Sequence, residues 1–282
     1  MGLLRHKTGL LLSALACMAL AACGGPSHMN LHDSSPPPPG LKTEFTQDSY
    51  ISVADQLRKS GSYEQALSFY QRAQVANPQD FRSFRGIGLC LLAVGANENA
   101  MNTLAHAAFL NPEDVETRAG LARVELEVGQ AEEARQQYQW LIAHDPRNSG
   151  YYNGLAVASD LVGRHADAQA NYSLAINLAP DNRSLRNNLA LSFAFAGEFD
   201  AAKEILSDMQ DSPRARQNLA LVYGLAGERG KAKATAMQDL SEADATRNLA
   251  SYDHLRGLPS REQAAIVLLG HPLPAQQAAT DQ

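Results

Sequence analysis

The chain has 282 residues, of which 45% are hydrophobic and 6% aromatic, and its formal net charge at pH 7 is −6. An acidic chain does not suit nucleic acid or an anionic lipid surface as its principal partner. Its three cysteines are too few to form a disulfide framework over this length.

Residues 1–22 have the pattern of a secretory signal. Arg5 and Lys7 precede an apolar stretch, residues 8–20, that is too short to span a bilayer. It ends in Leu-Ala-Ala-Cys23, which resembles the bacterial lipobox. The resemblance implies that Cys23 carries covalent diacylglycerol and an N-acyl chain. The alternative is a plain signal anchor with an incidental cysteine. Gly24, rather than aspartate, follows Cys23, and by analogy with enterobacterial sorting this favours the periplasmic face of the outer membrane.

Residues 23–45 are expected to form a flexible, proline-rich linker, since Pro36–Pro39 is held extended among small and polar residues. From about residue 46 the sequence repeats every 34 residues, with glycine, proline and alanine recurring in step. The recurring positions are Gly61, Gly95, Gly129, Gly163 and Gly197; Pro78, Pro112, Pro146 and Pro180; and Ala66, Ala100, Ala134, Ala168 and Ala202. A fixed period of this length is typical of stacked repeats.

Each repeat has the pattern of two short helices. In the first, Asp48–Lys59 and Tyr63–Val75 carry apolar residues at helical spacing. Gly61 suits the end of the first helix, and Pro78 ends the second. Neither helix is long enough to be stable alone, so the units must stack on one another.

The period and the second unit, Phe84-x2-Ile87-Gly88-x2-Leu91 followed by Ala100, Leu104 and Pro112, resemble the tetratricopeptide repeat. The resemblance implies an all-α fold: a right-handed α-solenoid of about six to seven helix-turn-helix repeats. We expect six repeats and a degenerate C-terminal capping repeat over residues 46–270, and a disordered tail over residues 271–282.

The last units depart from the period in two ways. The fifth and sixth are four residues shorter, about one helical turn, which predicts a shortened second helix in each. Ser260-x-x-Gln263 resembles a capping box and predicts a final short helix that covers the open end of the array.

The sequence indicates no enzyme. It has no His-Glu-x-x-His motif and no phosphate-binding glycine loop, and its histidines lack metal-ligand spacing. Serine, histidine and acidic residues are present, but no motif brings them together. We therefore expect no catalytic residues, no metal, no cofactor beyond the acyl chains of Cys23 and no small-molecule substrate.

A binding groove is the more plausible functional feature. Asn188, Asn218 and Asn248 recur in the phrase Asn-Leu-Ala of three first helices. Their position resembles the asparagine ladder in the groove of O-linked N-acetylglucosamine transferase, where donor and acceptor atoms suit a peptide backbone. The alternative is that these residues bond to the neighbouring helix or cap a turn.

Arginines near these positions form a candidate rim for acidic side chains or a terminal carboxylate. The alternative is that they are solvated and pair with neighbouring Asp and Glu. The arginines that we predict to bind the partner are Arg85, Arg123, Arg186, Arg216 and Arg247.

The C-terminal third carries a more specific resemblance. Residues 216–227 (RQNLALVYGLAG), 239–241 (DLS) and 248–252 (NLASY) look like the TadD family, the tetratricopeptide lipoproteins of tight-adherence (Flp-type) pilus assembly. The resemblance implies a pilotin or assembly factor whose partner is the pilus secretin or an associated Tad protein. The alternative is an envelope scaffold for peptidoglycan enzymes or outer-membrane protein assembly.

Overall fold

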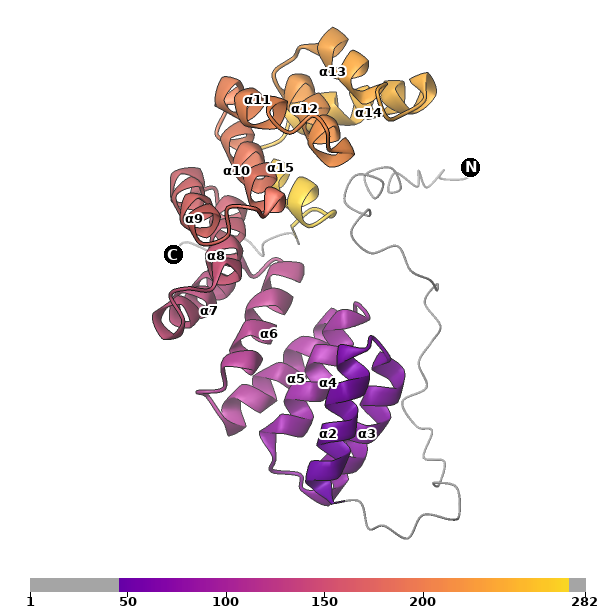
Figure 1. Ribbon diagram of the computed structural model, residues 1–282, viewed down its shortest axis with the longest axis vertical. Helices are drawn as coiled ribbons and strands as arrows, with labels where there is room; N and C mark the ends of the chain where they lie inside the picture. The colour runs from indigo at the N-terminus through magenta and orange to yellow at the C-terminus, as the bar shows by residue number, and fades with distance from the viewer. Residues whose placement is uncertain (1–45, 274–282) are drawn as a thin grey trace, which may run out of the picture. The chain divides into compact units, whose positions relative to one another are not determined.

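The computed structural model describes residues 46–273, which contain 14 helices and no strand (Figure 1). They divide into two compact units, residues 46–112 and residues 113–273. None of the helices in this range is long and apolar enough to span a membrane. Our predictions for Cys23, the linker and the extreme C-terminus fall outside the described residues.

The first unit consists of two helix pairs, as the sequence pattern predicts. The pairs are α2 (Gln47–Lys59) with α3 (Tyr63–Ala76), and α4 (Phe81–Ala93) with α5 (Asn97–Leu110). The recurring alanines, here Ala66 and Ala100, are fully buried between paired helices. Position 86 requires glycine, because a Cβ there would lie 2.2 Å from the ring of Tyr70. Small residues at these positions let the helices approach closely.

The second unit continues the same pattern over ten helices. They are α6 (Val115–Glu127), α7 (Ala131–His144), α8 (Ser149–Leu161), α9 (His165–Leu178), α10 (Arg183–Phe195), α11 (Phe199–Ser207), α12 (Pro213–Leu225), α13 (Arg229–Ala236), α14 (Glu242–Arg256) and α15 (Ser260–Leu268). From α6 to α14, each helix packs on the next one along the chain. The first helices of successive repeats, α6, α8, α10, α12 and α14, also pack on one another and form one layer.

The shortened repeats confirm the sequence prediction. Helices α11 and α13 have 9 and 8 residues, whereas α7 and α9 each have 14. The first helices α10 and α12 keep the 13 residues of α8. The loss of one turn therefore falls on the second helices, and the layer of first helices continues unbroken.

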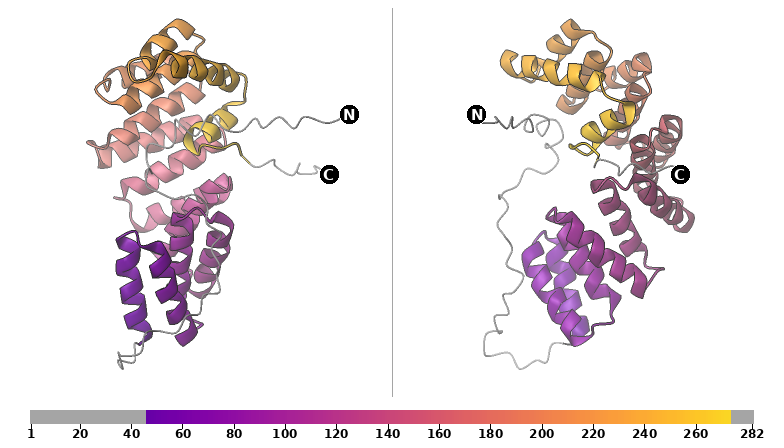
Figure 2. Two further views of the ribbon diagram at one scale, coloured as in Figure 1. Left: turned by 90° about the vertical axis from the view of Figure 1, so that its right-hand side faces the viewer. Right: turned by 180° about the vertical axis from the view of Figure 1, so that it is seen from behind.

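The position of α15 differs from our prediction. The helix begins at Ser260 as expected, but it does not cover the open end of the array. It turns back after residues 257–259 and packs mainly on α8 and α10 (Figures 1 and 2). The reason is its apolar face, Ala264, Ala265 and Ile266, which joins the buried core along the layer of first helices.

The predicted capping box at the start of α15 is also wrong. The N-cap residue is Pro259, and no side chain caps the helix. Gln263 Nε2 instead donates to the Leu258 carbonyl at 2.9 Å. The Ser260 hydroxyl bonds to a histidine of another helix, as described below.

Candidate functional site

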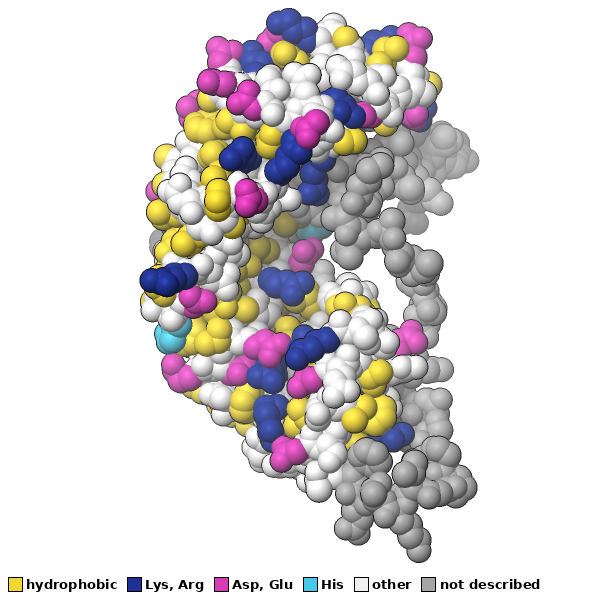
Figure 3. All heavy atoms as spheres, viewed as in Figure 1, with side chains coloured by type: hydrophobic (Ala, Val, Ile, Leu, Met, Phe, Trp, Pro, Cys, Tyr) yellow, Lys and Arg dark blue, Asp and Glu magenta, His cyan; other side chains and the backbone are white. Residues whose placement is uncertain are grey.

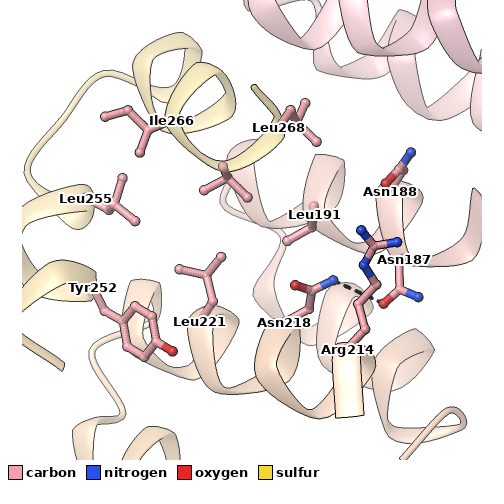
Figure 4. Close-up of a pocket in the computed structure, with 11 residues that line it drawn as sticks. Asn187, Asn188, Leu191, Arg214, Asn218, Leu221, Tyr252, Leu255, Ile266 and Leu268 are labelled. Atoms are coloured by element: carbon pink, nitrogen blue, oxygen red, sulfur yellow. Dashed lines mark hydrogen bonds between the residues drawn. The ribbon is translucent and has the colours of Figure 1, made fainter. Parts of the chain in front are cut away.

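A small cavity lies between α15 and the layer of first helices in the second unit, and its volume is about 110 Å³ (Figure 4). Helices α10, α12 and α14 form one wall and α15 forms the other. The polar part of the wall consists of Asn187, Asn188, Arg214 and Asn218. Leucines of the first helices and the aliphatic residues 266–268 of α15 supply the apolar part. We call the cavity, together with the face of α10, α12 and α14 that borders it, the groove.

Two of the predicted asparagines line the groove and also link neighbouring helices. Asn188 Nδ2 donates to Asn153 Oδ1 of α8 at 3.0 Å, and Asn218 Nδ2 donates to Asn187 Oδ1 of α10 at 3.1 Å. The two explanations that the sequence left open are therefore compatible. The third, Asn248, is half-buried on α14 and does not line the cavity. The ladder in the groove thus consists of Asn188, Asn187 and Asn218.

Arg214 is the groove residue that our site prediction omitted. It stands in the first turn of α12, is exposed and lines the cavity. Within residues 46–273 it makes no ion pair or hydrogen bond with another side chain. In Figure 4 it lies beside Asn187, Asn188 and Asn218. The signal in the sequence was its spacing, since residues four apart share one face of a helix and Arg214 precedes Asn218 by four.

Three of the predicted arginines in the second unit are engaged within the chain. Arg216 Nε donates to Asp239 Oδ2 at 2.9 Å, and this guanidinium lowers the pKa of the Asp239 carboxyl. Arg247 forms an ion pair with Asp244 one turn earlier. Arg186 reaches the Pro180 carbonyl at 3.5 Å. On the face shown in Figure 3, basic and acidic side chains are interspersed, as such local pairing requires.

The remaining two predicted arginines also lie outside the groove. Arg123 is exposed on α6. Arg85, in the first unit, lies with its guanidinium carbon 5.6 Å from the centre of the Phe81 ring. The four predicted arginines of the second unit therefore do not form one rim around the asparagines.

A partly buried chain of polar side chains links α15 to the repeats. His165 Nδ1 lies 2.8 Å from Asp160 Oδ1, and His165 Nε2 lies 2.9 Å from Ser260 Oγ. Ser192 Oγ donates to the same Asp160 oxygen at 2.7 Å. Asp160 is fully buried, and burial raises the pKa of its carboxyl, although the bonds from His165 and Ser192 act in the opposite direction.

The connectivity Ser260–His165–Asp160 is that of a Ser-His-Asp triad, which the sequence did not reveal because no motif spans these positions. A triad becomes catalytic where a substrate carbonyl can reach the serine beside hydrogen-bond donors. Neither Ser260 nor His165 lines the groove cavity. The chain of bonds instead joins α8, α9 and α10 to the first residue of α15, and it positions that helix.

The first unit has a hollow of its own, of about 440 Å³. Helices α3, α4 and α5 line it, and Ile87 and Leu91 of α4 contribute to its wall together with glutamine and asparagine amides. The rings of Phe84 and His106 meet edge to face there, with centroids 4.3 Å apart. The wall combines apolar and amide groups and carries no acidic or basic side chain other than His106.

The family comparison agrees with this architecture. Two tetratricopeptide-repeat models match residues 54–114 and residues 91–157. The helix pairs of the described residues are consistent with a tetratricopeptide α-solenoid. The fold is one that mediates protein–protein interaction or peptide binding, and no catalytic family is indicated. A comparison with curated proteins finds no match for this solenoid.

Solved tetratricopeptide structures resemble part of this solenoid. MamA AMB-1 shows 22% identity and a TM-score of 0.50, over 56% of this chain and 98% of that one. Residues 41 to the end of MamA from Desulfovibrio magneticus RS-1 show 18% identity and a TM-score of 0.55, over 58% of this chain and 93% of that one. YrrB, described as a TPR protein with an unusual peptide-binding site, shows 16% identity and a TM-score of 0.52, over 62% of this chain and 88% of that one. At these identities the likeness supports the fold alone.

Proposed function

We propose that this chain is an outer-membrane lipoprotein that binds the secretin of a Tad pilus, or a pilus protein associated with it, and acts as its pilotin or assembly factor. The observation that carries the binding role is the groove of the second unit. Its wall brings Arg214 together with Asn187, Asn188 and Asn218 beside an apolar floor. This combination of a cation, amide groups and leucines is suited to a protein segment.

The chemistry of the groove defines what the segment must offer. Arg214 has no acidic partner in the described chain, and a guanidinium binds carboxylates with two parallel hydrogen bonds. The asparagine amides supply donors and acceptors for a peptide backbone or for polar side chains. The leucines take up an apolar side chain. We therefore expect a segment that carries an apolar face and an acidic group.

The lipobox at Cys23 and the linker supply the location in this proposal. Acyl chains on Cys23 would hold the repeats at the outer membrane, and residues 24–45 would let them reach a partner nearby. Tethering of this kind raises the effective concentration of the partner. With a short flexible linker, this concentration is on the order of millimolar. The resemblance of residues 216–252 to the TadD family supplies the secretin as the partner.

The experiment is capture of partners from envelope extracts by the full-length lipidated protein. We expect the wild-type protein to recover the secretin or Tad pilus proteins, and a variant with Arg214→Ala and Asn218→Ala to recover much less. Arg247→Ala is the matched control, since Arg247 is exposed and lies outside the groove. Recovery of peptidoglycan enzymes or outer-membrane assembly factors instead would support the envelope-scaffold alternative and overturn the pilus role.

The location has a separate test. Replacing Cys23 with serine should move the protein from the outer-membrane fraction to the soluble periplasmic fraction, with its helicity unchanged. An unaltered membrane association of Cys23→Ser would rule out the lipid anchor.

A further inference from the structure

Helix α15 stands apart from the repeats because of where it packs. Helices α6 to α14 each lie on the next helix along the chain, whereas α15 lies mainly on α8 and α10, far earlier in the sequence. In Figures 1 and 2 it turns back from α14 and lies beside α10. The helix is thus seated on the layer of first helices, the surface where the groove is.

Two kinds of contact hold α15 in this position. Ala264 and Ala265 are fully buried and Ile266 is 9% exposed, so one face of the helix is in the core. The alanines allow close contact between the helix backbone and the layer. At its first residue, the Ser260 hydroxyl bonds to His165. A short amphipathic helix with small residues at its centre therefore fits this surface.

The fit of α15 to the groove is incomplete. Ile266, Val267 and Leu268 face a wall that contains Arg214 and Asn218, and a cavity remains between them (Figure 4). Aliphatic side chains cannot accept hydrogen bonds from a guanidinium. The polar side of the groove thus has hydrogen-bonding capacity that α15 leaves unused.

We propose that α15 is a built-in occupant of the groove, and that the partner binds there through an amphipathic helix of the same kind, which displaces α15. The partner helix carries two adjacent small residues followed by aliphatic ones, as in Ala264–Leu268, and an acidic side chain that meets Arg214. The inference rests on the proposed function in taking the groove as the partner site, and it adds the class of ligand and the competition with α15.

The competition has a measurable consequence. Only three residues, 257–259, join α14 to α15, so the released helix stays at high effective concentration near its site. A ligand that binds only the open groove has its apparent affinity reduced by the fraction of molecules in which the groove is open. Weakening the seat of α15 should therefore strengthen binding of a helix supplied from outside.

The probe is a fluorescent synthetic peptide of residues 258–270, titrated into the full-length chain. Ala265→Glu places a charge on the buried face of α15 and should release it. Ala243→Glu, at an exposed position in the first turn of α14, is the matched control. We expect Ala265→Glu to bind the peptide at least tenfold more tightly than the wild-type or control proteins. A peptide carrying Ala265→Glu should bind none of them.

Ser260→Ala is a second variant that keeps the inference testable if Ala265→Glu fails to fold. It removes the bond to His165 and adds no charge, and it should bind the peptide several-fold more tightly than wild type. Hydrogen exchange should show that the amides of α15 open in both variants while those of α8 and α10 stay protected. Equal peptide affinity for wild type and an opened variant would overturn the inference.

The two proposals can fail separately. If the peptide behaves as expected but the secretin is not captured, the pilus role fails and the groove competition stands. If the secretin is captured equally by wild type and Ala265→Glu, and the peptide does not compete with it, the shared site fails and the pilus role stands.

Discussion

His165 and Ser260 are 95 residues apart in the chain, yet His165 Nε2 lies 2.9 Å from Ser260 Oγ. The other nitrogen of the same ring bonds to the fully buried carboxylate of Asp160. One imidazole thus connects the interior of the repeats to a helix at the far end of the sequence. This relationship fixes where α15 starts and places its apolar residues on the layer of first helices.

Removing the two partners of this hydrogen bond should lower the free energy of unfolding by different amounts. His165→Ala leaves buried Asp160 with one hydrogen-bond donor fewer, so we expect it to lower the free energy of unfolding by roughly 1–3 kcal/mol. Ser260→Ala removes one half-buried hydroxyl and should cost about 1 kcal/mol or less. Urea denaturation checks both, with Ser173→Ala as control because its exposed hydroxyl bonds only to the Gln169 carbonyl. A cost for Ser260→Ala that exceeds that of His165→Ala would contradict this order.

The effect of replacing a glycine by alanine on stability should depend on the backbone conformation of that glycine. Gly163 has φ 79° between α8 and α9, where an L side chain costs about 1–2 kcal/mol. Gly230 is exposed in α13, has ordinary helical backbone and has open space around it. We expect Gly163→Ala to destabilise the chain by that amount and Gly230→Ala to stabilise it by roughly 0.5–1 kcal/mol. Thermal and urea unfolding measure the sign of the stability change for each variant. A stabilising Gly163→Ala would contradict the left-handed backbone conformation of this turn.

Glu125 should make stability depend on pH. Its side chain is 7% exposed on α6. Burial raises its pKa from the ordinary 4.5 to about 7, against the weaker opposite effect of the hydrogen bond from Gln137. The folded state therefore holds this proton more tightly than the unfolded state between pH 4.5 and 7. The free energy of unfolding contributed by this group should fall as pH rises through that window and stay level above it.

Glu125→Gln removes this ionisation and tests the argument. We expect the variant to match wild type near pH 4 and to be more stable at pH 8, by roughly 1–3 kcal/mol. Urea denaturation at a series of pH values measures the difference. Glu127→Gln, at an exposed position of the same helix, should leave the pH profile unchanged. Parallel profiles for Glu125→Gln and wild type would mean that this carboxyl does not carry the effect.

The sequence predicted the repeats well because their period and turn residues are local. A glycine such as Gly163 and a proline such as Pro180 mark helix ends wherever the chain lies in space. The shortened helices α11 and α13 were predictable for the same reason, since four residues make one turn. The packing position of α15 was not predictable, because its apolar residues indicate that the helix is buried but do not indicate which helices it packs on.

The groove shows the same limit. The recurrence of Asn188 and Asn218 indicated a shared face of the first helices, and both do line the cavity. Asn248 has the same place in its repeat, but the residues of α14 that line the cavity are Tyr252 and Leu255, further along the helix. Arg214 was not among the predicted binding residues, because only its helical spacing from Asn218 connects it to the groove. Side-chain pairing, as in Arg216 with Asp239, depends on neighbours that the period does not specify.

The asparagines provide the last prediction, which separates binding from folding. Asn218 lines the groove and donates to buried Asn187, so Asn218→Ala should weaken capture of the partner several-fold and cost about 1 kcal/mol of stability. In the pair of changes Asn218→Ala and Asn248→Ala, we expect the whole loss of binding to come from Asn218, because Asn248 lies outside the cavity. Asn248→Ala alone is therefore the matched control, and circular dichroism should show unchanged helicity for both. If Asn248→Ala weakened capture as much as Asn218→Ala, the partner would have to contact α14 beyond the groove, and the binding surface would extend along the whole layer of first helices.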